Sequence, residues 1–157
     1  MKLVIWSIGK PHERFVKEGI EEFTKRISRY FPVDWVIISP PKDIQTLTEA
    51  GQKKKEAERI IELIRPDTYL VVLDEKGKQF TSESLSSFLA ARAGASVKNI
   101  VFIIGGAFGI DESVRQKAHF VWSLSQLTFP HQLVRLILAE QLYRACTILK
   151  NEKYHHK

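Results

Sequence analysis

The sequence predicts an α/β fold in which helices cover both faces of a mainly parallel sheet. Short runs rich in Val and Ile alternate with helical segments along all 157 residues, and alternation at this spacing is typical of parallel sheets. The runs 68–74 and 99–105 are apolar at almost every position, as in strands that helices cover on both sides. The length fits one domain, so we expect residues 1–157 to form a single domain.

The first half of the chain is expected to contain two strands, two helices and a polar loop. The strands are short apolar, β-branched runs, and the first helix has apolar residues at helical spacing. Chain breakers end each element, namely Gly9, Pro32, Pro40-Pro41 and Pro66. The expected bounds are 2–8 and 33–39 for the strands, 12–30 and 52–65 for the helices, and 42–51 for the loop.

The second half is expected to continue the alternation with three strands and three helices. Thr81 or Ser82 can cap a helix that Gly94 ends, and Asp111 can cap a short helix. Pro130 opens the last helix, because proline is tolerated in a first turn. The expected bounds are 68–74, 99–105 and 119–125 for the strands, and 82–93, 112–118 and 130–149 for the helices.

Three loops follow predicted strands and are expected to meet at the carboxyl edge of the sheet, where α/β folds bind ligands. They lie after Leu73-Asp74, at Gly105-Gly106 and across 124–131. The glycine segment GGAFG lacks the spacing of a dinucleotide fingerprint and the Lys-Ser/Thr of a P-loop, which argues against a phosphate cradle. A tight turn remains one interpretation. Adjacent glycines also expose backbone groups and let a flat ring approach closely, which favours a small-molecule pocket.

The segment SLSQLTFPHQLVR (123–135) interleaves small polar residues with apolar ones. Such a loop can form an apolar slot with backbone polar groups facing inward, which suits a purine ring. His131 would lie in the first turn of the last helix, either bonded locally or functional.

The composition and charge of the chain limit the partners, metals and cellular locations that are expected for it. The net charge of +6 favours nucleic acid as a partner, or else reflects only a basic surface. The histidines show no metal-ligand spacing, so no metal is expected. Cys146 is expected to be a core residue of the last helix rather than a nucleophile. The six-residue apolar run near the N-terminus is too short for a signal or membrane segment, so a soluble, cytoplasmic protein is expected.

The motifs together resemble the SPOUT methyltransferases, and more narrowly the small family that methylates N3 of a pseudouridine in large-subunit (23S) ribosomal RNA. The resemblance covers nearly the whole chain. Its motifs are MKLVIWSIGK (1–10), LDEKGK (73–78), IIGGAFG (103–109), WSLSQLTFPHQLVRLILAEQLYRA (122–145) and KYHHK (153–157). The resemblance implies a C-terminal trefoil knot, a homodimer and S-adenosylmethionine as cofactor. The cofactor residues that it implies are Leu73, Gly105, Leu124, Ser125, Gln126, Leu127, Thr128 and Phe129.

The implied reaction requires a nucleophilic N3, which a general base or a stabiliser of the N3 anion would provide. The candidates are His155 or His131 as the base, Arg144 or the lysines of the tail as electrostatic support, and Tyr154 to stack on or orient the RNA base. An extra histidine, His156, stands where the family has a basic residue. RNA affinity would come from the dimer surface, with phosphate contacts from Arg14, Lys17, Lys25, Arg26, Arg29 and Lys53–Lys55. An assembled ribosome is the expected substrate.

Two other classes remain as alternatives. A non-catalytic RNA-binding α/β module would explain the charge and the glycines, but it would not require an apolar slot at 124–129. A flavodoxin-like phosphate binder would need a Ser/Thr-rich loop after the first strand, where this chain has Gly9-Lys10-Pro11-His12.

Overall fold

The computed structural model describes residues 1–155, and its centre is a five-stranded sheet in the order β2-β1-β4-β3-β5. All neighbouring strands are parallel, which confirms the predicted α/β class. The strands are β1 (Lys2–Ile8), β2 (Val33–Ile38), β3 (Thr68–Lys78), β4 (Asn99–Ile104) and β5 (Phe120–Trp122).

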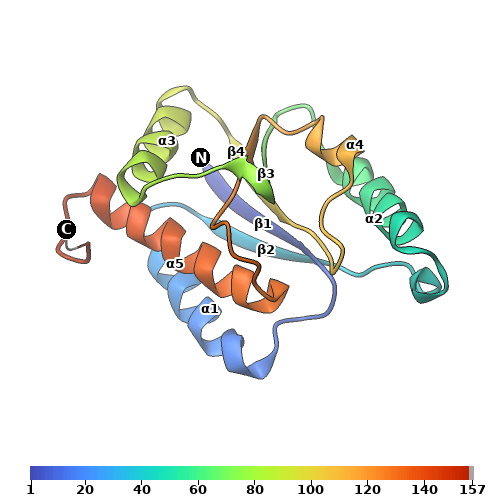
Figure 1. Ribbon diagram of the computed structural model, residues 1–157. Helices are drawn as coiled ribbons and strands as arrows, with labels where there is room; N and C mark the ends of the chain where they lie inside the picture. Colours follow the sequence, from blue (N-terminus) through green and yellow to red (C-terminus); the bar gives the residue numbers. More distant parts are fainter. Residues whose placement is uncertain (156–157) are drawn as a thin grey trace.

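Helices cover both faces of the sheet, as predicted. Figure 1 shows α1, α3 and α5 on one side of the strands and α2 with α4 on the other. Their bounds are α1 (Arg14–Ile27), α2 (Glu49–Leu63), α3 (Ser82–Gly94), α4 (Glu112–Arg115) and α5 (His131–Leu149), with a short 3-10 helix at Ile44–Thr46.

The capping predictions are confirmed at two helices. The Thr81 hydroxyl accepts a hydrogen bond from Ser84 N at 3.1 Å, and the Ser84 hydroxyl accepts one from Thr81 N at 2.8 Å, which forms a capping box. The Asp111 carboxylate accepts a hydrogen bond from Ser113 N at 2.9 Å and caps α4. These caps fix where the chain turns from the loops back over the sheet.

Several element bounds were predicted wrongly, and α1 spans 14–27 rather than the expected 12–30. The expected loop over 42–51 contains the 3-10 helix and the start of α2, because Thr48 caps α2 by accepting a hydrogen bond from Gly51 N at 3.2 Å. β3 continues to Lys78 and pairs again with Trp122 after a register shift beyond Leu73. β5 and α4 are shorter than expected, with bounds 120–122 and 112–115.

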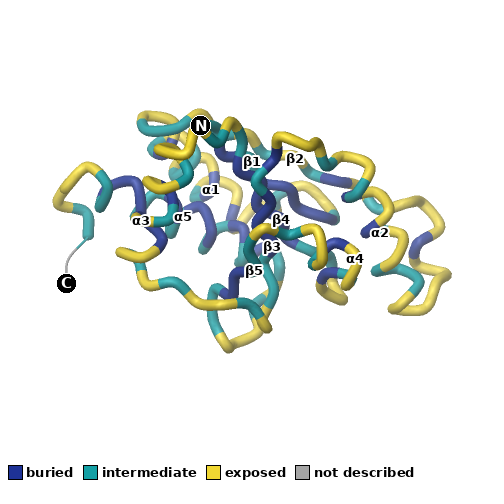
Figure 2. Tube along the Cα trace, turned by 90° about the horizontal axis from the view of Figure 1, so that it is seen from above, coloured by how far each residue is buried: buried dark blue, intermediate teal, exposed yellow. Residues whose placement is uncertain are grey.

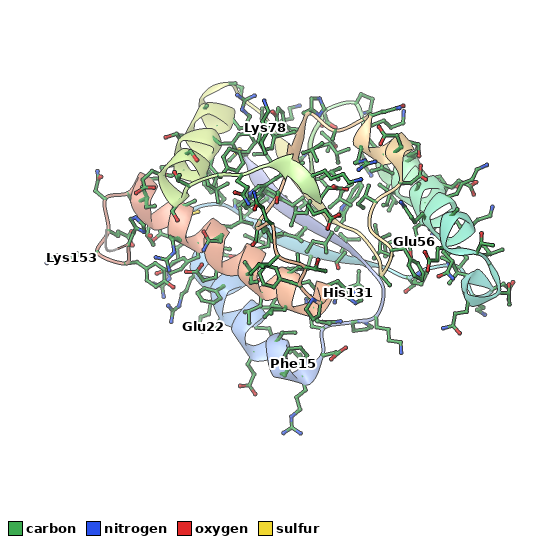
Figure 3. All side chains as sticks on the ribbon, in the orientation of Figure 1. Phe15, Glu22, Glu56, Lys78, His131 and Lys153 are labelled. Carbon is green, nitrogen blue, oxygen red and sulfur yellow. The ribbon has the colours of Figure 1, made fainter. Side chains whose placement is uncertain are left out.

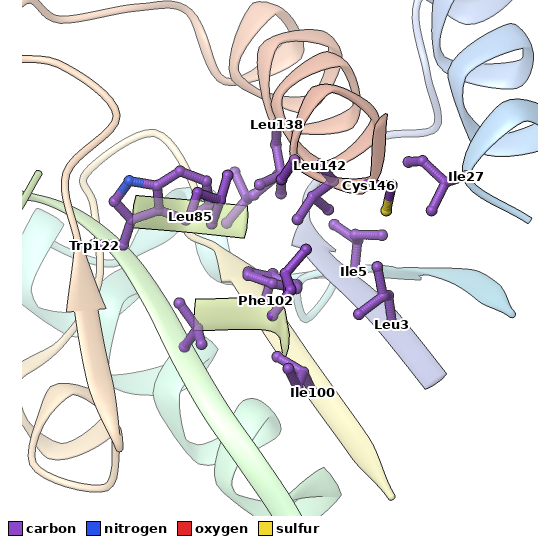
Figure 4. Close-up of a cluster of buried hydrophobic side chains, with 14 residues drawn as sticks. Leu3, Ile5, Ile27, Leu85, Ile100, Phe102, Trp122, Leu138, Leu142 and Cys146 are labelled. Atoms are coloured by element: carbon purple, nitrogen blue, oxygen red, sulfur yellow. The ribbon is translucent and has the colours of Figure 1, made fainter. Parts of the chain in front are cut away.

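The sheet separates two hydrophobic cores. Figure 4 shows the larger one, where Leu138 and Leu142 of α5 lie over Ile5 and Phe102 of the sheet. The smaller core packs Ile60 and other side chains of α2 and α4 against the opposite face. The burial view in Figure 2 shows the strands as a dark, buried strip with exposed loops around them. Burial on both faces explains why β4 is apolar at almost every position.

We expect Leu138→Ala to lower the free energy of unfolding by about 2–5 kcal/mol, because Leu138 is fully buried and its loss leaves a cavity. Urea unfolding would measure the change. Leu63→Ala is the matched control, since Leu63 at the end of α2 is 37% exposed. An equal loss in both variants would contradict this account of the core.

Among residues 1–155, no helix combines the length and the apolar character needed to cross a membrane. The trefoil knot implied by the resemblance stays a prediction, because strand order and layers do not define how the chain threads.

Candidate cofactor pocket and C-terminal cluster

A cavity of about 440 Å³ opens at the carboxyl ends of β3, β4 and β5, beside the start of α5. The three predicted loops meet there, as expected for the edge of a parallel sheet. Of the residues that the resemblance implies for the cofactor, those lining the cavity are Leu73, Gly105, Leu124, Ser125, Leu127, Thr128 and Phe129. Gln126 lies in the same loop but is exposed and not part of the lining.

The glycine segment forms a closed turn on one wall of this cavity. Gly109 N donates to Gly106 O at 3.2 Å, and Gly109 has a φ of +82°, which favours glycine. A Cβ atom on Gly105 would lie 2.9 Å from the Ile110 side chain and 3.0 Å from the Gly109 carbonyl carbon. Gly105 is therefore required for the turn to pack against the end of β4.

Serine side chains hold the loop after β5 in place. The buried Ser123 hydroxyl donates to Ser125 O at 2.9 Å, and the Ser125 hydroxyl accepts a hydrogen bond from Leu127 N at 3.0 Å. These local bonds satisfy polar groups within the loop. The apolar side chains at 124 and 129 can then line the cavity.

A charged rim lies beside the apolar walls, and the sequence analysis did not find it. Arg115 donates to the Asp74 carboxylate at 3.2 Å, and the Asp74 side chain is only 10% exposed. Arg115 also pairs with Glu112. Lys53 of α2 and Lys76 of β3 line the same cavity. The sequence feature that pointed to this rim was Asp74, which directly follows a buried apolar run. No short-range sequence pattern linked Asp74 to Arg115.

His131 is the predicted catalytic candidate that the structure places at the pocket. It lines the cavity from the first turn of α5. Burial, reinforced by the positive charge of Arg135, lowers the pKa of His131 below its usual value. The imidazole is therefore neutral at neutral pH.

Arg135 is fully buried and ties the loop after β1 to α5, which the sequence did not reveal. Its guanidinium donates to Lys10 O at 2.9 Å and to Ile8 O at 3.4 Å. The neighbouring Gln132 donates to Pro11 O at 3.1 Å. These bonds hold the 9–13 loop against the first turns of α5, where His131 lies.

The other catalytic candidates gather around Glu140, in the middle of α5. Arg144 donates to Glu140 Oε1 at 2.5 Å, and the Tyr154 hydroxyl donates to the same oxygen at 3.2 Å. The Arg144 guanidinium lies 4.9 Å from the centre of the Tyr154 ring. Burial, with the Glu140 carboxylate as the next cause, raises the pKa of Tyr154. Glu140 was missed as a site residue, although its position four residues before Arg144 puts both on one helix face.

His155 joins this cluster through both ring nitrogens. Nδ1 lies 3.4 Å from Arg144 Nη1 and Nε2 lies 3.3 Å from Glu83 Oε1. A guanidinium can only donate, so Nδ1 accepts and Nε2 carries the proton that faces the carboxylate. We name Glu140, Arg144, Tyr154 and His155 the C-terminal cluster. The prediction for His156 lies outside the described residues.

The pocket lies at the start of α5, whereas the C-terminal cluster extends from the middle of α5 toward its C-terminal end. His131 and Arg144 are separated by about 20 Å along the helix axis, at the rise of an α-helix. Figure 3 shows the same separation, with His131 at one end of α5 and Lys153 beyond the other. The described part of the tail, up to His155, therefore does not line the cavity of its own chain.

Cys146 is buried in the larger core, and burial raises the pKa of its thiol to about 12. We expect no reaction of the native protein with Ellman's reagent at neutral pH, because the thiolate is the reactive form. The same protein in concentrated guanidinium chloride should react fully. Equal rates in the native and unfolded protein would contradict this assignment.

Within residues 1–155, no three His, Cys, Asp or Glu side chains are grouped so that they could hold a metal ion.

Comparison with known proteins places the chain in a family. An α/β fold with a cavity at the carboxyl edge of its sheet is typical of proteins that bind a small ligand there. Residues 1–155 match the family model described as "Predicted SPOUT methyltransferase", and the chain belongs to this family.

The chain is also similar to curated proteins over its full length. It is 44% identical to "Ribosomal RNA large subunit methyltransferase H" of Parabacteroides distasonis, with 100% of both chains covered. It is 41% identical to the protein of the same name from Cytophaga hutchinsonii, covering 99% of this chain and 100% of that one.

A solved structure shares the fold. The structure of a probable methylase family protein from Haemophilus influenzae Rd KW20 superposes with a TM-score of 0.54 at 13% identity. The match covers 99% of this chain and 70% of that chain. At this identity the likeness concerns the fold alone.

Proposed function

We propose that this protein transfers a methyl group from S-adenosylmethionine to N3 of a pseudouridine in 23S ribosomal RNA, on assembled ribosomes in the cytoplasm. The observation that carries the proposal is the cavity at the carboxyl edge of the sheet, which joins three loops that the family resemblance links to the cofactor. The names of the full-length relatives support large-subunit ribosomal RNA as the substrate.

The residues of the cavity fit the proposed cofactor. The side chains of Leu73, Leu124 and Phe129 offer apolar walls for an adenine ring, and the glycine turn leaves backbone groups accessible. Asp74, Lys76 and Arg115 offer charged partners for polar groups. When bound, S-adenosylmethionine supplies a methyl group activated by a positively charged sulfur.

The side chains of the protein would align the acceptor nitrogen with the methyl group and accept the proton that this nitrogen loses. Much of the rate enhancement in such a displacement can come from positioning. N3 of pseudouridine must lose its proton, and the candidate bases are His131, neutral at the pocket, and His155, whose Nδ1 is an acceptor. Arg144 would stabilise the N3 anion, and Tyr154 would orient the base.

A homodimer would bring the two separated groups together. Arg144 of the C-terminal cluster is about 20 Å from His131 along its own α5, so we propose that a second copy supplies the cluster if it acts at the pocket. Twofold dimers make such exchanges reciprocal, and each pocket would receive the partner's tail. We therefore propose that the active site is shared between two subunits.

Basic residues beside the pocket support RNA binding. Lys53 lines the cavity from α2, and Lys54 follows on the same helix. The net charge of +6 adds a general attraction for phosphate. The dimer surface would supply the RNA affinity.

The test is methyl transfer from radiolabelled S-adenosylmethionine to ribosomes that lack the modification, with free 23S RNA in parallel. We expect label in the ribosomes, and mass spectrometry of the nucleosides should show 3-methylpseudouridine. Binding of ribosomes without methyl transfer or cofactor binding would instead indicate a non-catalytic RNA-binding module.

A further inference from the structure

One carboxylate beside the glycine turn has no place in the reaction described so far. Glu56 lies in the middle of α2, where its carboxylate packs against Gly106 of the turn. Figure 3 shows Glu56 on the side of α2 that faces the loops at the end of the sheet. It is not a lining residue of the cavity, although Lys53, one turn earlier on the same helix, is.

Glu56 holds the backbone of Gly106. The Glu56 carboxylate lies against the backbone of Gly106, whose N–H favours the charged form of the carboxyl group and so opposes the rise in pKa that burial causes. A Cβ atom on Gly106 would lie 2.5 Å from Glu56 Oε1 and 2.7 Å from Oε2. The carboxylate therefore packs directly on the glycine, and any side chain at position 106 would displace it.

This contact differs from those of Glu58 and Glu62, which lie on the same helix. Glu58 pairs with Lys55 and Glu62 pairs with Arg59, both at the surface. Within residues 1–155 Glu56 has no ion pair, and burial raises its pKa. A half-buried carboxylate without a cation is costly unless hydrogen bonds compensate it. The contact with the Gly106 backbone offsets part of this cost, and it joins α2 to the pocket wall.

The contact between Glu56 and Gly106 would stabilise the glycine turn, which forms one wall of the cavity. Gly105 and Gly106 line the cavity, and the turn is closed by the bond from Gly109 N to Gly106 O. A shift of Gly106 would therefore move the backbone that faces the ligand.

We propose that Glu56 is a positioning residue, which fixes the glycine turn 105–109 as the wall of the cofactor pocket. This inference rests on the proposed function in taking S-adenosylmethionine as the ligand. Glu56 does not touch the ligand; it acts through Gly106.

Calorimetry with S-adenosylmethionine would test this role in the full-length protein. We expect Glu56→Ala to weaken binding by about tenfold or more, because the carboxylate that holds the Gly106 backbone in place is lost. Glu56→Gln keeps an acceptor oxygen and should bind within about threefold of the wild type. Glu58→Ala, on the exposed side of the same helix, is the matched control and should bind like the wild type.

A double-variant cycle would test the contact itself. Gly106→Ala should weaken binding as Glu56→Ala does, because the new Cβ displaces the carboxylate. The double variant should bind no more weakly than either single variant, since both changes remove the same contact. Additive losses would overturn the proposal.

Hydrogen exchange gives a readout that does not need the cofactor. Glu56→Ala should speed exchange in 103–110 and leave the strands of the core unchanged. Wild-type exchange and affinity in this variant would overturn the inference, as would faster exchange throughout the protein, which indicates a general loss of stability. If the wild-type protein binds no S-adenosylmethionine, the proposed cofactor is wrong, and exchange in 103–110 still decides whether Glu56 fixes the turn.

Discussion

Replacing Gly105 by valine is expected to weaken S-adenosylmethionine binding by more than about tenfold, the scale of forced overpacking. A Cβ atom at this position would lie 2.9 Å from the Ile110 side chain and 3.0 Å from the Gly109 carbonyl carbon. The second contact is with backbone, so the turn that lines the cavity must move. Calorimetry on the purified protein would measure the loss.

Gly94→Val is the matched control. Gly94 ends α3, and a Cβ atom there meets nothing within 4 Å. This variant should bind the cofactor like the wild type. Unchanged binding in Gly105→Val, with the protein folded, would place the cofactor away from the glycine turn.

Mixing two inactive variants is expected to restore methyl transfer. Gly105→Val removes the pocket and keeps the C-terminal cluster, whereas the double variant Tyr154→Ala with His155→Ala keeps the pocket and removes the tail groups. In a mixed dimer, the intact tail of one subunit would meet the intact pocket of the other. An equal mixture should recover about a quarter of wild-type activity, because half of the dimers are mixed and each has one complete site.

The ribosome assay would measure this recovery after the differently tagged variants are unfolded together and refolded. Each variant refolded alone is the control and should stay inactive. If the tail acts within its own chain, every mixed dimer contains two broken sites, and no activity should return.

Local patterns predicted the strands and the cap of α3, because periodicity and capping residues act over a few positions. The start of α2 was missed although Thr48 offers a cap, since the residues before 52 show no apolar period. The extension of β3 to Lys78 depends on a second pairing with Trp122, which lies 44 residues further along the chain.

The pocket was predictable where it depends on the loops after strands, since topology alone brings those loops together. Its charged and supporting residues were not. Asp74 contacts Arg115, and Glu56 contacts Gly106. The residues of each pair lie too far apart in the sequence for the period of a helix or strand to link them. The C-terminal cluster was partly predicted, but its separation from the pocket requires the length and direction of α5.

A single helix, α5, carries both His131 at the pocket and Glu140 and Arg144 of the C-terminal cluster. The helix therefore fixes the angle between these groups about its axis as well as the distance between them along it. Each residue of an α-helix adds about 100° of rotation and about 1.5 Å of rise. One residue inserted between Gln132 and Glu140 would turn the C-terminal cluster to another side of α5 while leaving both groups intact. The chemistry thus depends on the angular register of α5 as much as on the side chains that it carries.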